Sequence, residues 1–319
     1  MKSFIDLSAL MLSRLLVLLL ALLPERTAMS IANVVVRFGV MLVPRFRRVA
    51  LRNLEIAFPE LSLDRRREIF SDSLGVLARN LYSFATLERL SLPLLRSCVV
   101  NWKEFQEKLE RIRAKNTAPG LIVTTAHFGS FELLAQAYTI LYKPLSILAR
   151  GFGLERLDEW WNGRRELHGA EIFSRKGAYR EIIERLQRGH DVALLVDQNV
   201  KQNHATFVPF FGLKAATTRA VALASLQSGA SVIFATAVEI SPWKFRALLV
   251  ELEAPEPGLP RSEWIECLSA DLNRAIESAI REYPSQWFWV HRRWKTRPPG
   301  ESETIYGNRI KSSLSAVTM

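Results

Sequence analysis

The first 44 residues are far more apolar than the rest of the chain. Residues 7–24 read LSALMLSRLLVLLLALLP and carry one charge, Arg14. Roughly 17 apolar residues in a row is at the short limit for a helix that spans a membrane. A second apolar stretch, 31–44, is interrupted by Arg37, which favours an interfacial or packed helix. We expect residues 1–44 to anchor the chain, and the two segments together suggest attachment to one leaflet.

Cationic residues flank the first apolar run unequally. Lys2 alone precedes it, whereas a series of arginines follows it, namely Arg26, Arg37, Arg45, Arg47, Arg48 and Arg52. Because cytoplasmic flanks of membrane helices are rich in Lys and Arg, the rest of the chain is predicted to face the cytoplasm. A cleaved signal peptide is the alternative, but Pro24 and Glu25 stand where a small-x-small cleavage site would lie. We favour a retained anchor.

Residues 45–115 show the spacing of amphipathic helices. Apolar positions recur on one face while basic and acidic residues occupy the other. Asp64 is suited to cap a helix that begins at Arg65. Pro119 and Gly120 then break the pattern, and the short apolar run LIVTTA that follows predicts a buried strand.

Beyond this strand the chain alternates between short apolar runs and longer helical patterns. Strands are expected at 121–126, 145–150, 170–173, 192–198, 231–240 and 245–252. Helices are expected at 130–141, 154–167, 177–188, 217–228 and 262–282. This order predicts an α/β fold with a mixed, mostly parallel central sheet flanked by helices, behind an N-terminal membrane-anchoring helix. We expect a catalytic domain at 45–300 and a flexible polar tail at 301–319.

Composition narrows the possible partners. The 319 residues carry a formal net charge of +11, which suits phosphate-rich partners: nucleic acid, an anionic membrane or an acidic lipid. Cys98 and Cys267 are far apart and lie outside any C-x-x-C spacing. The sequence therefore indicates neither a disulfide framework nor a zinc site, and no ligand cluster implies a metal or redox cofactor.

The strand at 121–126 ends just before a histidine. His127 lies where parallel sheets place their sites, and Gly129 and Ser130 are suited to open the next helix. Glu132 follows five positions after the histidine, and two such side chains meet only if the histidine precedes the helix. We expect Glu132 to orient the ring as His127 accepts a proton, with amides at the helix start holding an oxyanion. The alternative is a strand-end histidine near an unrelated glutamate.

Four segments of the sequence resemble one enzyme family. AHFGSFE (126–132) is similar to the His-x4-acid motif of the glycerolipid and lysophospholipid acyltransferase superfamily. Three further segments resemble the bacterial lipid A late acyltransferases, the lauroyl and myristoyl transferases. They are RVALRNLEIAFPEL (48–61), VDQN with the later FVPFFG (196–212), and YPSQWFWVHRRWKTRPPG (283–300). The resemblance extends from the anchor to about residue 300.

The resemblance implies transfer of an acyl chain from acyl carrier protein to a hydroxyl of a lipid A precursor or related glycolipid. It implies that His127 is the general base and Glu132 its partner, on an enzyme of the bacterial inner membrane. A lysophospholipid or aminolipid acceptor stays open. So does a non-enzymatic protein that binds membrane or nucleic acid, although the apolar anchor favours lipid over nucleic acid. Direct transfer suits a chain with no G-x-S-x-G nucleophile motif.

Several other residues are candidates for binding substrate. Arg150 ends a predicted strand and is suited to an anionic head group, or is simply solvated. Arg165 matches an arginine of related mycobacterial acyltransferases, whereas Arg164 is expected to be exposed. Asp197 and Gln198 also end a strand, in a stretch that lies near the acceptor site in the family, although a strand-end cap is the alternative.

The remaining histidines and the C-terminal aromatics have simpler interpretations. His168, His190 and His204 have no acidic partner at motif spacing, so we expect loop or surface positions. His291 is expected to pack or to contact lipid. Its segment interleaves aromatic and cationic residues, a combination that suits a membrane interface or a phosphorylated glycolipid. These residues are Trp287, Trp289, Arg292, Arg293, Trp294, Lys295 and Arg297.

Overall fold

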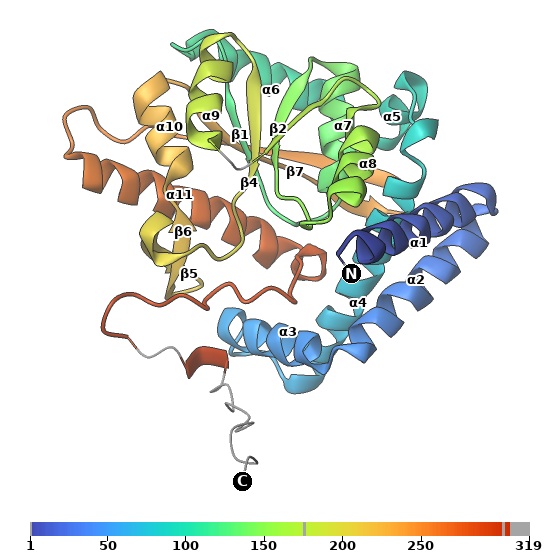
Figure 1. The fold of residues 1–319 in the computed structure, drawn as a ribbon. Helices are drawn as coiled ribbons and strands as arrows, with labels where there is room; N and C mark the ends of the chain where they lie inside the picture. The colour runs from blue at the N-terminus through green and yellow to red at the C-terminus, as the bar shows by residue number, and fades with distance from the viewer. Residues whose placement is uncertain (1, 175–176, 302–303, 307–319) are drawn as a thin grey trace.

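A six-stranded sheet lies at the centre of the molecule, for which the computed structural model describes residues 2–174, 177–301 and 304–306 (Figure 1). Its strand order is β3-β2-β4-β1-β7-β8, and neighbouring strands are parallel except β7 and β8. The strands are β1 (Ile122–Thr125), β2 (Leu145–Ala149), β3 (Glu171–Ser174), β4 (Asp191–Leu195), β7 (Val232–Ser241) and β8 (Lys244–Leu252). The predicted fold class, α/β with a mostly parallel sheet flanked by helices, is confirmed.

Helices cover both faces of the sheet because its strands are apolar on both sides. These helices are α5 (Leu92–Cys98), α6 (Trp102–Lys115), α7 (Phe131–Leu141), α8 (Glu155–Glu166), α9 (Ala178–Gln187), α10 (Ala220–Ser228) and α11 (Arg261–Glu282). Ile122 packs into the core under α9, α10 and α11, whereas its neighbour Val123 packs into the core under α6 and α7.

Four helices precede this layered core. They are α1 (Lys2–Leu22), α2 (Glu25–Leu42), α3 (Pro44–Ala57) and α4 (Leu63–Ala85). α1 and α2 lie side by side, and both pack against α4 (Figure 1). The side chain of Ser62 caps α4 by accepting from the amide of Arg65 at 3.2 Å, so the cap is Ser62 and the expectation for Asp64 is wrong.

A two-stranded hairpin was not expected from the sequence. β5 (Ala205–Phe210) pairs with β6 (Leu213–Thr218) in antiparallel register and packs against α11. A helix was predicted to begin at 217, but α10 begins at Ala220. The small residues of LKAATT carry little apolar signal for a strand, so the hairpin depends on packing.

The expected tail, 301–319, lies mostly outside the described residues. Its described part includes the short turn Thr304–Tyr306, which packs back onto the domain. The Tyr306 hydroxyl donates to Asn53 at 2.7 Å and accepts from the amide of Trp294 at 3.1 Å.

Candidate functional site

The loop between β1 and α7 is held by backbone hydrogen bonds on two sides. The C-terminal segment contributes two of them: the carbonyl of His127 accepts from the amide of Phe288 at 2.9 Å, and the amide of Gly129 donates to Gln286 at 2.7 Å. From the sheet, the carbonyl of Ala237 accepts from the amide of Ser130 at 2.7 Å. The amides of Gly129 and Ser130 are thus already bonded, so they are not the expected donors to an oxyanion.

Gly129 is required by this packing. Its φ is +56°, a conformation that disfavours residues with a side chain, and an added Cβ would lie 2.1 Å from the carbonyl oxygen of Ala237. The tight approach brings the loop onto β7 and leaves the histidine at the carboxyl end of β1.

Asp197, not Glu132, is the partner of His127. The two strands β1 and β4 are adjacent and parallel, with Thr125 opposite Leu195, so the residues just beyond each strand meet. His127 Nδ1 lies 2.9 Å from Asp197 Oδ1. The second oxygen, Oδ2, accepts from the indole nitrogen of Trp287 at 2.9 Å.

The electrostatics of this pair favour an ionised aspartate. Burial of Asp197 acts to raise the pKa of the carboxyl, but the charge and hydrogen bond of His127 and the Trp287 donor outweigh it and hold the pKa at about 2. With both oxygens bonded and 2% of its surface exposed, Asp197 has no free face for a substrate. Asp197 thus binds the histidine ring in this structure, and contact with the acceptor stays an untested prediction.

The histidine ring stays partly open to solvent. Its side chain is 29% exposed, while that of Asp197 is 3% exposed. The Gln198 amide nitrogen lies 3.4 Å from each ring nitrogen, at the outer limit of a hydrogen bond. Phe131 meets the ring edge-on at 5.4 Å between centroids. The ring is thus oriented from the buried side and accessible from the other.

Glu132 binds Arg165 instead of the histidine. It lies in the first turn of α7 with only 8% of its surface exposed. Arg165 of α8 donates to it with Nε, 3.1 Å from each carboxylate oxygen, and with a terminal nitrogen. A buried carboxylate is stabilised better by a guanidinium fork than by one ring nitrogen. The expected hydrogen bond between His127 and Glu132 is therefore wrong.

The neighbouring arginine is structural. Arg164 is buried, which corrects the expectation that it is exposed. It pairs with Glu88 at 2.8 Å and donates to the carbonyls of Phe84 and Ala85 at the end of α4. Arg150, by contrast, is exposed just after β2, and the described part of the chain provides it with no hydrogen bond or ion pair.

The C-terminal aromatics form core rather than surface. Trp287, Trp289 and Trp294 are each at most 1% exposed, and Arg293 is fully buried with hydrogen bonds to Ala216, Thr217 and Asn273. For these buried side chains the expected contact with membrane or glycolipid is wrong, whereas Arg292 is half-buried and Lys295 is exposed, so for those two it stays a prediction. The buried side chains anchor the segment that contacts the His127 loop and Asp197.

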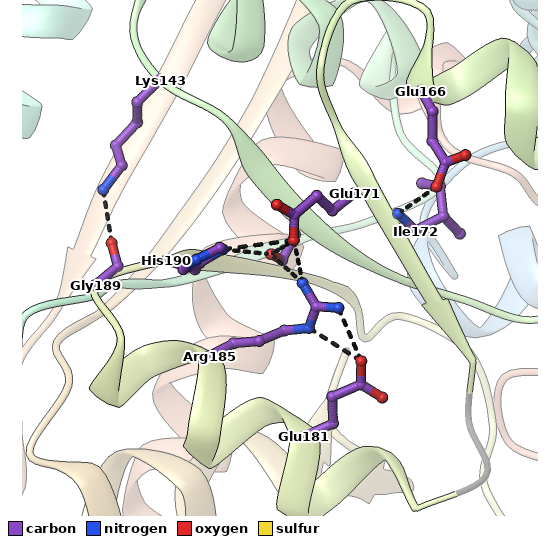
Figure 2. Close-up of polar contacts among 9 residues, drawn as sticks. Lys143, Glu166, Glu171, Ile172, Glu181, Arg185, Gly189 and His190 are labelled. Atoms are coloured by element: carbon purple, nitrogen blue, oxygen red, sulfur yellow. Dashed lines mark hydrogen bonds and ion pairs between the residues drawn. The ribbon is translucent and has the colours of Figure 1, made fainter.

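Another cluster with a histidine lies at the amino ends of the strands (Figure 2). Arg185 of α9 contacts Glu171 and, at 2.8 Å, Glu181, while His190 Nδ1 lies 3.5 Å from Glu171. The cluster borders an open cavity of about 480 Å³. Here Arg185, a permanent cation, shares the carboxylate of Glu171 with His190.

The other expected positions add little chemistry. His168 binds the carbonyl of Leu87 at 2.8 Å, and His204 is exposed in a short turn. Across the described ranges, no three His, Cys, Asp or Glu side chains come together in a way that could hold a metal ion.

The residues missed by the sequence analysis are Trp287, whose indole donates to Asp197, and Gln286, whose backbone carbonyl accepts from the His127 loop. Their position in the resembling segment 283–300 was the only available signal.

Comparison with known proteins gives one consistent family. The family model for bacterial lipid A biosynthesis acyltransferases matches residues 7–296. The chain is 28% identical over 278 residues to the lipid A biosynthesis palmitoleoyltransferase of Escherichia coli (strain K12), covering 83% of this chain and 85% of that protein. It is 24% identical over 277 residues to the lauroyltransferase of that strain, with 83% and 84% covered. The myristoyltransferase is 24% identical over 282 residues, with 88% and 85% covered. The resemblance expected from the motifs is confirmed.

Proposed function

The chain belongs to the bacterial lipid A biosynthesis acyltransferase family and is an acyltransferase, and from this premise we propose that it moves a fatty acyl chain from acyl carrier protein to a hydroxyl of a lipid A precursor or related glycolipid. The non-enzymatic alternative is thereby set aside. The observation that carries the mechanism is the partly exposed His127 ring held by a buried Asp197.

His127 is the general base in this proposal. An ionised Asp197 accepts a hydrogen bond, so it favours the tautomer with the proton on Nδ1 and the lone pair on Nε2. Nε2 removes the proton of the acceptor hydroxyl as its oxygen attacks the thioester carbonyl. The C–O bond forms, the C–S bond breaks, and the imidazolium returns its proton to the thiolate that leaves. Asp197 stabilises the imidazolium in between.

The remaining polar residues have supporting roles. Arg165 and Glu132 form a largely buried ion pair that fixes α7 against α8, and so positions the start of α7 beside the base. Gln198 is placed to contact a substrate over the ring. Arg150, exposed beyond β2, is suited to a phosphate of the acceptor. Among the amides at the start of α7, only those beyond Ser130 remain candidate oxyanion donors.

The membrane completes the proposal. α1 is the one described helix long and apolar enough to cross a bilayer by itself, and we propose that it anchors the enzyme at the inner membrane with the catalytic domain on the cytoplasmic side. Both the water-soluble donor and the lipid acceptor would then reach the same site.

Reconstitution with purified protein tests this function. Acyl carrier protein carrying a radiolabelled acyl chain and a lipid A precursor in detergent should give a product one acyl mass heavier. His127→Ala should abolish the product while circular dichroism and lipid binding stay unchanged. If a lysophospholipid or an aminolipid is labelled and the lipid A precursor is not, the acceptor is that lipid. If none of the three acceptors is labelled, the proposal is rejected. Mass spectrometry of lipid A from a deletion strain would identify the acyl chain and its position together.

A further inference from the structure

The N-terminal helix α1 is long enough to cross a bilayer, but its contacts place it along the domain. Its apolar window, Ser3–Leu22, corresponds to about 30 Å of helix, the thickness of the hydrocarbon region. A crossing helix has its two ends on opposite sides of that region. In this protein both ends of α1 contact the same folded domain.

The first contact is a carboxylate in the first turns of α1. Asp6 is 7% exposed, and its two oxygens accept from the amides of Arg156 at 3.1 Å and Leu157 at 3.2 Å. These amides belong to the first turn of α8, whose own preceding residue, Leu154, provides no side-chain cap. α1 therefore supplies the acceptor that the amino end of α8 lacks.

The second contact is at the opposite end of α1. The carbonyl of Ala21 accepts from the guanidinium of Arg89. Arg89 belongs to a short turn that also contains Glu88, and Glu88 pairs with Arg164 of α8. The two contacts of α1 thus lead to one connected part of the domain.

Charges beside α1 also argue against a crossing orientation. Arg14, near the middle of α1, is exposed. The helix α8 packs against α1 and exposes Glu155, Arg156 and Glu159. A perpendicular crossing would place these side chains in hydrocarbon, where charged groups are strongly disfavoured. In an orientation parallel to the bilayer, Arg14 can reach the head groups while its helix stays in contact with lipid.

The outer surface of the α1–α2 hairpin is nonetheless apolar. Phe4, Leu12 and Leu15 on α1 are 63–75% exposed, and Phe38 and Met41 on α2 are 53% and 65% exposed. A soluble protein rarely exposes so many large apolar side chains on two neighbouring helices. Basic residues of α3 follow directly, with Arg45, Arg47 and Arg48 all exposed. An apolar face beside cations matches an anionic bilayer surface.

We propose that α1 does not cross the bilayer. The α1–α2 hairpin inserts its exposed apolar face into one leaflet of an anionic membrane, and both ends of α1 stay on the side of the catalytic domain. This inference rests on the proposed membrane attachment, but not on the identity of the donor or acceptor. Because Asp6 caps α8 and α8 carries Arg165, the membrane-bound helix is joined directly to the site.

Cysteine labelling tests the topology. Cys267 is exposed and reports the side of the catalytic domain once Cys98 is replaced by serine. A second protein, with both cysteines replaced, carries a Cys-Gly-Ser extension before Met1. A membrane-impermeant maleimide is applied to spheroplasts and to inverted inner-membrane vesicles. We expect both reporters to react from the same side, and reaction from opposite sides would overturn the proposal.

Insertion is tested separately. Leu12→Glu charges the outer face of α1, and Leu226→Glu charges an exposed apolar position of α10 that lies outside the hairpin. We expect Leu12→Glu to lower the fraction of protein that resists extraction by alkaline carbonate at least fivefold, with Leu226→Glu unchanged. The proposal would be overturned if Leu12→Glu and the wild type resisted extraction equally, or if the wild type were found in the soluble fraction. Acyl transfer in detergent is measured in parallel. If no acylated product forms while the cysteine labelling and the carbonate extraction give the expected results, the enzymatic proposal fails and the topology proposal stands.

Discussion

Two histidines lie near carboxylates at opposite ends of the same sheet, and they differ in what surrounds the acid. At the carboxyl end, Asp197 is buried, and its two oxygens bind His127 and Trp287. At the amino end, the side chain of Glu171 is 46% exposed and is shared between Arg185 and His190 (Figure 2). The first histidine has a dedicated partner, whereas the second competes with a permanent cation.

The difference bears on the proposed role of His127 in proton transfer. An acid that orients a ring has to be ionised, fixed and not neutralised by a neighbouring cation. Asp197 stays ionised because the His127 ring and the Trp287 indole outweigh the effect of its burial, and their two hydrogen bonds fix it in place. The carboxylate of Glu132 binds Arg165 instead of His127, and the guanidinium compensates its charge. Proximity of histidine and acid in sequence or in space is therefore insufficient.

The largest expected effect separates the two histidines. His127→Ala should lower kcat by about 10³-fold or more, because general-base catalysis contributes roughly 10²–10⁴-fold and the base also orients the acceptor. His190→Ala should stay within about twofold of wild type. Initial rates of acyl transfer at saturating substrate check this prediction. Similar losses of kcat in the two variants would contradict a functional difference between the two ends of the sheet.

The next effect concerns the partner of the ring. Asp197→Asn keeps the shape but removes the charge that selects the tautomer, so we expect kcat to fall by about 10²-fold with KM nearly unchanged. Glu171→Gln, at the other end, is the matched control and should have no such effect. Wild-type activity in Asp197→Asn would make this hydrogen bond irrelevant to catalysis.

A smaller effect is expected for the ion pair between α7 and α8. Glu132→Gln leaves Arg165 without a counter-charge in a mostly buried place, so both stability and rate should fall. We expect a loss of about tenfold in kcat with a lower Tm, less than for His127→Ala. The double variant Glu132→Gln with Arg165→Met should recover part of the Tm. A loss of rate as large as that of His127→Ala, with an unchanged Tm, would instead make Glu132 a direct participant.

The last prediction concerns stability as a function of pH, and the smallest effect on the rate of acyl transfer is expected from it. Burial lowers the pKa of His291 from 6.5 to about 4. Between these values the unfolded chain binds a proton that the folded chain does not, so the free energy of unfolding should decrease as pH falls from about 6.5 to about 4, by up to about 3 kcal/mol. Asp197, whose pKa is about 2, stays ionised throughout this window.

Thermal unfolding between pH 7 and pH 4 checks this prediction. His291→Gln should flatten the decrease in Tm relative to wild type, whereas His190→Gln at the amino end should leave it unchanged. Parallel curves for wild type and His291→Gln would mean that the buried imidazole does not contribute.

Local pattern predicted most of the elements of this protein. Apolar runs and helical spacing indicated the strands and helices of the sheet, because each depends on neighbouring residues and on burial of one or two faces. The position of His127 after β1 followed from the same pattern. The hairpin β5–β6 was missed, since its short second strand has few large apolar residues.

Which side chains meet was decided only by the tertiary structure. Asp197 lies 70 residues after His127, and β4 has to be the neighbour of β1 before the two can touch. Glu132, five residues away, is turned by its helix toward Arg165. The tryptophans that looked like membrane contacts are core, because burying large rings outweighs the cationic pattern around them. Sequence determined most of the elements and the position of the proposed base, because these depend on local periodicity. Strand order and burial depend on the whole chain, and they determined which side chain meets His127.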